Sequence, residues 1–196
     1  MPKPKAVVLI GPPGCGKGTI KRRFTEIGFI PFEMSDELKK RMKKDPEFHA
    51  AADDLMARGE LITDEMIVET AIPALMEMGC NRDLVISGIP RTIGQVAVLD
   101  EYLAKRGYDY YFCVFNLTEE ACKNRILQDP NRTDRRDNDP DVIDARMEYY
   151  RQHIPSIERY FDLAVNEERF FWVSAADSPI EVWEKVLANI PVRASI

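Results

Sequence analysis

The stretch GPPGCGKGTI, residues 11–20, follows a short apolar run and contains the pattern Gly11-x-x-x-x-Gly16-Lys17. Glycines at these positions let several backbone N–H groups turn toward one anion, and the lysine can reach outer phosphates. A helix expected over 17–27 would add its positive N-terminal end. A flexible turn is the alternative interpretation, but the apolar run before the loop and the helix after it favour a phosphate-binding loop.

The loop departs from the common pattern at one position. The residue after Lys17 is Gly18, and the hydroxyl comes one place later, at Thr19. A direct side-chain ligand to Mg²⁺ is therefore not expected here. The sequence predicts instead a metal held through water molecules, with no metal ligands from the protein.

Short apolar runs alternate with longer helical patterns along the chain. The runs are nearly continuous in hydrophobicity, as in strands that are covered on both faces. They span 6–10, 29–34, 83–87, 110–117 and 169–175. This alternation predicts an α/β fold, a parallel sheet with helices on both faces. Ligands of such sheets bind beyond the carboxyl ends of the strands, so the residues after each run are the candidates.

Two helix starts can be read directly. Thr63 is a candidate N-cap, with acidic residues in the first turn after it. Asp139 before Pro140 is a second one, because proline favours the first helical position. The stripe of a long amphipathic helix follows, at Ile143, Met147, Tyr150, Ile154, Ile157 and Phe161.

The third run is followed by SGIPRTIGQ, residues 87–95. Arg91 emerges at the carboxyl end of this strand, where a second anion could lie opposite the first. Gln95 is one helical turn later, so its amide could face the same pocket and both donate to and accept from a base edge. Taken alone, the stretch is equally consistent with a turn that carries a surface arginine.

Five arginines fall within 22 residues, at positions 125, 132, 135, 136 and 146. Arg146 lies at the rim of the buried stripe of the long helix, where it can be anchored and still reach a cleft. Interleaved aspartates make a solvated, ion-paired surface the alternative. Beside a phosphate loop, arginines favour stabilisation of the charge that spreads over a transferring phosphoryl group.

The bulk composition narrows the classes of function. The chain has 196 residues, 45% hydrophobic content and a formal net charge of −6, which argues against a non-specific nucleic-acid binder. The sequence shows no membrane-length apolar stretch and no signal-peptide core. The cysteines form no CxxC pair. We therefore expect a reducing, cytoplasmic setting and neither a nucleic-acid nor a membrane partner.

Taken together, the motifs resemble those of the nucleoside monophosphate kinases, and adenylate kinases most closely. Five stretches match in order across nearly the whole chain: GPPGCGKGT; GELITDE (59–65); GIPRTIGQ (88–95); the spacing of Arg125, Arg135 and Arg146; and VSAADSPIEV (173–182). The resemblance implies a three-layer P-loop NTPase fold with a five-stranded parallel sheet. It implies one kinase domain over 1–196, a helical acceptor-binding insertion over 35–65 and a short lid over 128–138.

The resemblance also implies roles for individual residues. Lys17, Arg91, Arg135 and Arg146 would be catalytic. The ATP site would comprise Gly14, Cys15, Gly16, Lys17, Gly18, Thr19 and Arg125. The acceptor monophosphate would be bound by Met34, Ser35, Lys39, Ile62, Gly88, Arg91 and Gln95. Mg²⁺ would accompany ATP, the protein would be a monomer, and the Pro90 peptide bond would be cis.

Three departures from the family pattern bear on activity. Ser87 stands where the family has an aspartate that organises waters around magnesium. Lys39 replaces an arginine that grips the acceptor phosphate, and lysine is a point charge rather than a fork. Asp129 stands where a further arginine is expected.

The sequence therefore predicts transfer of the terminal phosphoryl group of ATP to a nucleoside monophosphate, AMP first, in line and without a covalent intermediate. Two alternatives remain open. One is a degenerate module that binds nucleotides without turnover. The other is a kinase of the same fold for UMP, CMP or another small acceptor.

Overall fold

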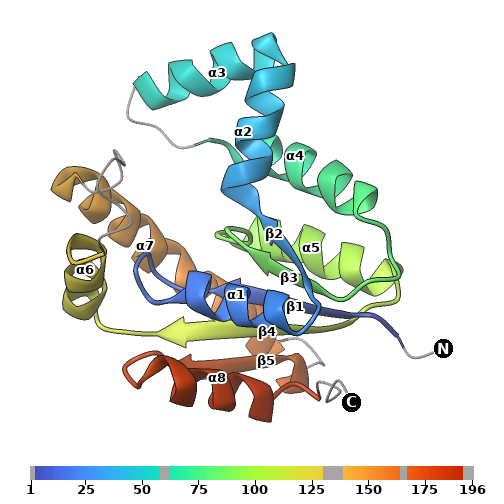
Figure 1. Cartoon of the computed structure of the whole chain (residues 1–196). Helices are drawn as coiled ribbons and strands as arrows, with labels where there is room; N and C mark the ends of the chain where they lie inside the picture. Colours follow the sequence, from blue (N-terminus) through green and yellow to red (C-terminus); the bar gives the residue numbers. More distant parts are fainter. Residues whose placement is uncertain (1–2, 58–61, 130–138, 164–166, 192–196) are drawn as a thin grey trace.

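Five parallel strands form the centre of the protein, which is represented by a computed structural model that describes residues 3–57, 62–129, 139–163 and 167–191. The sheet order is β2-β3-β1-β4-β5 (Figure 1). The strands are β1 (Lys5–Ile10), β2 (Ile30–Glu33), β3 (Leu84–Ser87), β4 (Asp109–Asn116) and β5 (Phe170–Ser174). Each lies within one residue of a predicted run at its start, and the predicted five-stranded parallel sheet is confirmed.

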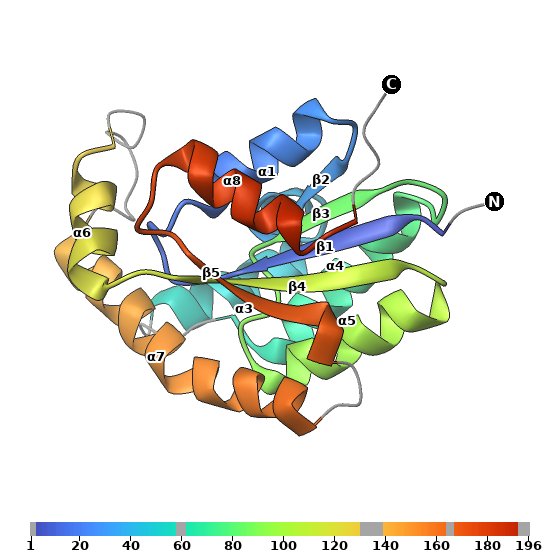
Figure 2. The ribbon, with the colours of Figure 1, turned by 90° about the horizontal axis from the view of Figure 1, so that it is seen from below.

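Helices cover both faces of this sheet (Figure 2). The helices are α1 (Lys17–Glu26), α2 (Met34–Lys44), α3 (Pro46–Ala57), α4 (Asp64–Glu77), α5 (Ile93–Lys105), α6 (Glu119–Leu127), α7 (Pro140–Leu163) and α8 (Pro179–Ala188), with a 3₁₀ turn, η3 (Glu167–Arg169). One core cluster packs α1, α6 and α8 against the sheet, and the other packs α4 and α5. Helix α7 contributes to both clusters, since Ile143 belongs to one and Ile157 to the other.

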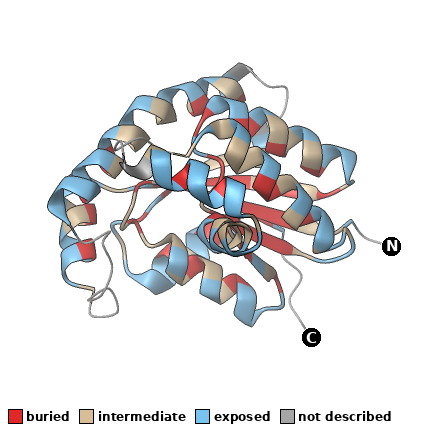
Figure 3. Ribbon diagram, turned by 90° about the horizontal axis from the view of Figure 1, so that it is seen from above, coloured by how far each residue is buried: buried red, intermediate tan, exposed pale blue. Residues whose placement is uncertain are grey.

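Strand β1 shows why the apolar runs are continuous. Its Val8 and Ile10 side chains belong to the cluster beneath α5, whereas Val7 and Leu9 belong to the cluster beneath α1. All four are at most 3% exposed. Side chains alternate along a strand, so both alternating sets must be apolar when helices cover both faces. Figure 3 shows buried residues concentrated in the strands and on the inward faces of the helices.

Helices α2 and α3 stand beside the sheet rather than on it (Figure 1). Arg41 of α2 holds this layer together: its guanidinium donates to the Thr70 hydroxyl of α4 at 2.9 Å and lies 4.1 Å from the ring centre of Phe48 of α3. Residues 35–65, over which an acceptor-binding insertion is predicted, comprise most of α2, all of α3 and the start of α4, and residues 58–61 lie outside the described residues.

Both predicted helix starts are present. The Thr63 hydroxyl accepts the Met66 N–H at 3.3 Å, and the Asp139 carboxylate accepts the Asp141 N–H at 3.0 Å. Helix α7 then runs from Pro140 over 24 residues. None of the helices in the described ranges has a stretch long and apolar enough to cross a membrane.

Candidate active site

The glycine loop packs closely against neighbouring parts of the protein. Gly14 has φ +80°, and a Cβ added there would lie 2.5 Å from the Cys122 carbonyl oxygen and 2.8 Å from the Ile126 side chain, both on α6. Gly11, at φ +157°, would place a Cβ 2.8 Å from the Cys15 sulfur. Close packing therefore explains two of the glycines, and it presses the loop against α6.

Lys17 is the first residue of α1, and its side chain folds back over the loop. Its Nζ donates to the Gly11 and Pro12 carbonyl oxygens at 2.7 and 2.9 Å and lies 3.5 Å from the Cys15 sulfur. The ammonium is thus held at the mouth of the loop. Cys15 itself is 2% exposed.

Arg125, near the end of α6, lies across the outer side of the loop. Its guanidinium donates to the Ala175 carbonyl oxygen at 2.8 Å and to the Cys15 carbonyl oxygen at 3.5 Å. Gly16 lies next to it, because a Cβ there would be 3.9 Å from an Arg125 nitrogen. Arg125 therefore bridges the loop and the residue that follows β5.

The second loop leaves the strand next to β1. Leu9 pairs with Ser87 in the parallel register, so residues 11–17 and 88–92 start at the same edge of the sheet, one strand apart. Gly88 has φ +85°, and the Ile89–Pro90 peptide bond is cis, as expected. The Arg91 Nε donates back to the Gly88 carbonyl oxygen at 3.1 Å, which fixes the base of this arginine.

Positive charge converges at this edge. The pKa of Arg91 is lowered, first because the protein surrounds the guanidinium and displaces water, and second because of the positive charge of Arg146 on α7. Tyr149 and Glu33 act on the same group in the opposite direction. Arg91 is an exposed residue whose guanidinium lies near a second cation, Arg146. Such a pair is suited to an anion.

Gln95, on the first turn of α5, is 2% exposed, and both ends of its amide contact protein. Its Oε1 accepts the Arg91 backbone N–H at 2.8 Å, and its Nε2 donates to the Asp64 carboxylate at 2.7 Å. The other Asp64 oxygen accepts the Thr92 hydroxyl at 2.5 Å. The amide thus contacts the Arg91 backbone, within a network that no sequence pattern indicated.

The remaining acceptor-side candidates differ in exposure. Met34 is 1% exposed and belongs to the core cluster that contains β3, so its side chain is not brought to an open surface. Ser35 is exposed, and Ile62 is partly buried. The Lys39 side chain is 67% exposed and lies 3.8 Å from Asp36. The structure therefore assembles Gly88, Arg91 and Gln95 firmly, whereas Lys39 is held loosely.

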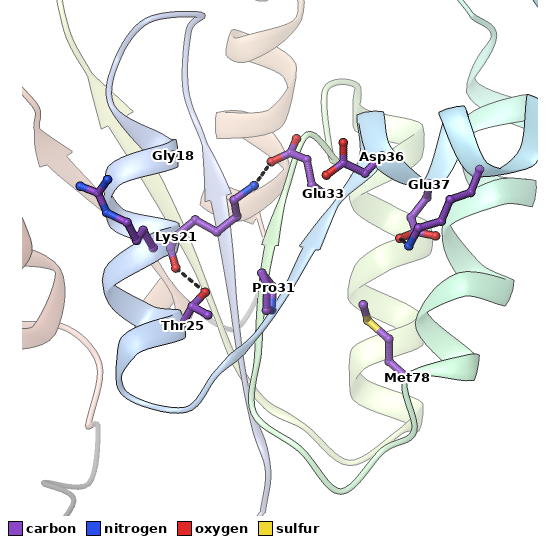
Figure 4. Close-up of a pocket in the computed structure, with 10 residues that line it drawn as sticks. Gly18, Lys21, Thr25, Pro31, Glu33, Asp36, Glu37 and Met78 are labelled. Atoms are coloured by element: carbon purple, nitrogen blue, oxygen red, sulfur yellow. Dashed lines mark hydrogen bonds and ion pairs between the residues drawn. The ribbon is translucent and has the colours of Figure 1, made fainter. Parts of the chain in front are cut away.

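A hollow of about 540 Å³ runs beside the site, between α1, the edge strand β2 and α2 (Figure 4). Among the predicted site residues, only Gly18 lines it. Four of the charged side chains that line it are paired, Lys21 with Glu33 and Lys40 with Glu37. The hollow thus borders the loop edge of the site without containing its convergent cations.

Two further predictions concern Arg135 with the lid, and the metal ion. Arg135 and most of the predicted lid lie outside the described residues. Within the part of the chain that the structure describes, no group of three or more His, Cys, Asp or Glu side chains could hold a metal ion. Lys17 and Arg125 contact the glycine loop, and Arg146 lies close enough to Arg91 to lower its pKa.

A glycine loop that opens a helix after β1, with Arg91 in the loop after the adjacent strand β3, is typical of P-loop phosphotransferases. Comparison with known sequences identifies the family within this class: the family model described as "Adenylate kinase" matches residues 9–165. The chain therefore belongs to the adenylate kinase family and is a nucleoside monophosphate kinase by class, an enzyme that transfers a phosphoryl group between nucleotides.

Individual relatives cover most of the chain. The adenylate kinase of Thermus thermophilus is 28% identical over 190 residues, which is 96% of this chain and 98% of the relative. That of Maricaulis maris is 32% identical over 154 residues, 77% of this chain and 82% of the relative. The adenylate kinase of Methylobacterium nodulans is 29% identical over 163 residues, 79% and 82% respectively.

Proposed function

We propose that the protein transfers the terminal phosphoryl group of ATP to AMP and yields two molecules of ADP. One observation carries the proposal: the loop with Lys17 and the loop with Arg91 leave adjacent parallel strands at the same edge of the sheet, Leu9 beside Ser87. Two anionic nucleotides bound at these loops would meet with their phosphates facing each other. The relatives named adenylate kinase support the choice of substrates.

Each side of the site has a separate task in this proposal. On the donor side, the loop N–H groups and Lys17 bind the phosphates of ATP, and Arg125 stacks on its base. On the acceptor side, Arg91 binds the monophosphate and Gln95 contacts the base. Arg146, with Arg135 from the lid, stabilises the charge on the group in transit. The chemistry is positioning and charge neutralisation, without a covalent intermediate.

Magnesium enters this proposal as a companion of ATP. The described residues contain no carboxylate cage, and Mg²⁺ readily keeps water in its coordination sphere while it binds phosphates. The residues present fit such an ion. The hydroxyl oxygens of Thr19, on the first turn of α1, and of Ser87, beside Glu33 in the sheet register, would accept hydrogen bonds from its water molecules. Bound there, the ion would neutralise charge on the phosphates of ATP.

The closing segments are part of the same proposal. Residues 35–65 would form the acceptor-binding insertion, and residues 128–138 the lid, within one kinase domain. Their closure over the nucleotides would exclude water, which would otherwise accept the phosphoryl group.

A panel of acceptors tests the proposed function. The protein is mixed with ATP and Mg²⁺ and with AMP, CMP, UMP, dTMP or GMP in turn, and each diphosphate is quantified. We expect AMP to be converted with the highest kcat/KM. Conversion of UMP or CMP ahead of AMP would establish the alternative acceptor. Tight binding of ATP and AMP by calorimetry with no product over hours would establish a binding module instead.

A further inference from the structure

The network around Gln95 fixes the direction of its amide. The Arg91 backbone N–H can only donate, so the atom that faces it must be the Gln95 oxygen. The Asp64 carboxylate can only accept, so the atom that faces it must be the Gln95 nitrogen. Rotation of the amide by 180° would oppose two donors on one side and two acceptors on the other.

Among the described residues, each end of this amide keeps one further hydrogen-bonding capacity, within a side chain that is 2% exposed before any base binds. The nitrogen carries two N–H bonds, one of which is used by Asp64, and the oxygen has a second lone pair beside the one used by Arg91. A donor and an acceptor in a fixed order match adenine, whose N1 accepts and whose amino group donates. They oppose guanine, whose O6 accepts where adenine donates and whose N1 donates where adenine accepts.

We propose that Asp64 is a specificity-determining residue that makes the acceptor site selective for adenine by fixing the direction of the Gln95 amide. Asp64 acts as a positioning residue, through Gln95, and this inference rests on the proposed function of Gln95 as the base contact. The carboxylate is well placed for the task, since it also receives the Thr92 hydroxyl at 2.5 Å and joins the first turns of α4 and α5.

The surroundings of Asp64 strengthen the constraint. The Thr92 hydroxyl that donates to Asp64 accepts the Gln95 backbone N–H at 3.3 Å, so the cap of α5 and the amide are tied to the same carboxylate. A Cβ on Gly94 would lie 3.4 Å from an Asp64 oxygen, which shows how closely this turn packs on it. Asp64 therefore has little freedom to swing away.

The first experiment replaces Asp64 by asparagine, which keeps the shape of the side chain and removes the all-acceptor character. Asp64→Asn is expected to lower the ratio of kcat/KM for AMP to that for GMP on the order of tenfold. The asparagine can donate to the oxygen of a flipped Gln95 amide, so the flipped amide is disfavoured only by the Arg91 N–H. The KM for AMP rises, and the KM for ATP stays unchanged. Calorimetry with AMP and GMP alone reads the same loss of discrimination without turnover.

Asp100→Asn is the matched control. Asp100 also accepts two side-chain hydrogen bonds, from the Tyr110 and Tyr160 hydroxyls at 2.6 and 2.8 Å, but it lies away from the proposed substrates. The control should leave the AMP to GMP ratio unchanged. An unchanged ratio in Asp64→Asn, or an equal change in the control, would overturn the inference.

A second experiment exchanges the polarity of the pair. Gln95→Glu alone sets two carboxylates against each other and should lower the melting temperature; adding Asp64→Asn restores a hydrogen bond and should recover it. The double variant presents only acceptors to the base, so its preference should move toward GMP. If the double variant did not recover the melting temperature, the hydrogen bond between Gln95 and Asp64 would be contradicted. This readout does not depend on activity: a protein that phosphorylated no monophosphate would contradict the proposed function separately.

Discussion

The proposed donor and acceptor sides of the site are held in different ways. On the donor side, Arg125 and Lys17 bind backbone carbonyl oxygens, and the glycine loop packs against the α6 backbone. On the acceptor side, Gln95 and Thr92 depend on one carboxylate, Asp64, from a helix outside the sheet. The donor side thus depends on contacts with the backbone, whereas the acceptor side depends on hydrogen bonds between side chains. We therefore expect single substitutions to change the specificity of the acceptor side.

The largest expected effect breaks the donor side. Lys17→Ala should lower kcat on the order of 10³-fold, because it removes the cation that neutralises the phosphates of ATP. Steady-state kinetics with varied ATP and AMP measure it. Lys105→Ala, an exposed lysine paired with Glu101 on α5, serves as the control and should retain full activity. Activity within a few fold of the wild type in Lys17→Ala would mean that the loop does not hold the donor.

The acceptor side is tested by Arg91. Arg91→Ala should raise the KM for AMP by about 100-fold, as expected for loss of charged hydrogen bonds to a phosphate, and should change the KM for ATP little. Arg151→Ala, an exposed arginine on α7 paired with Glu119 and Glu148, is the comparison variant. If the KM for ATP rose and that for AMP did not, the two sides would have been assigned in reverse.

A third test compares two glycines of the donor loop region. Gly14→Ala should destabilise the protein by about 2 kcal/mol, since a Cβ at φ +80° meets the Cys122 carbonyl at 2.5 Å. Gly18→Ala should stabilise it by about 0.5–1 kcal/mol, because Gly18 lies in α1 with no atom within 4 Å of the added carbon. Urea unfolding of both variants measures the difference. Equal effects would show that the loop does not pack on α6 as described.

The smallest expected effect concerns Tyr110, whose hydroxyl donates to Asp100. Asp100, like Asp64, accepts two side-chain hydrogen bonds, but it lies away from the proposed site. Burial and then the hydrogen bond to Asp100 raise the pKa of Tyr110 to about 12 from an ordinary value of 10.0. The neutral phenol is favoured in the fold, so this stabilisation is complete below pH 10 and is lost as the pH rises through about 12. Tyr110→Phe should therefore flatten the fall in melting temperature over this range. An unchanged alkaline slope would exclude Tyr110 as a source of it.

The donor side could be predicted from sequence because its determinants are local. A loop of glycines after an apolar run and the lysine that opens the next helix are adjacent in the chain, so their spacing alone indicates a phosphate site. The strands were also predictable, since burial on both faces leaves continuous apolar runs. The order of the strands, by contrast, depends on packing between distant segments.

The proposed acceptor side was only partly predictable, because some of its contacts join residues that are far apart in the chain. Arg91 and Gln95 could be found because they follow a strand directly. The hydrogen bonds that join Thr92 and Gln95 to Asp64 span 28 and 31 residues of the chain. Asp64 looked like an ordinary acidic residue in a helix first turn, and nothing in its local sequence indicated Gln95 as its partner.

The central claim is that two nucleotides bind with their phosphates facing each other between Lys17 and Arg91. Calorimetric titration with a single compound in which five phosphates join two adenosines tests it directly. We expect one molecule to bind per chain, more tightly than ATP or AMP alone, with affinity lost in both Lys17→Ala and Arg91→Ala. Binding no tighter than that of ATP, or binding weakened by only one of the two substitutions, would contradict the account.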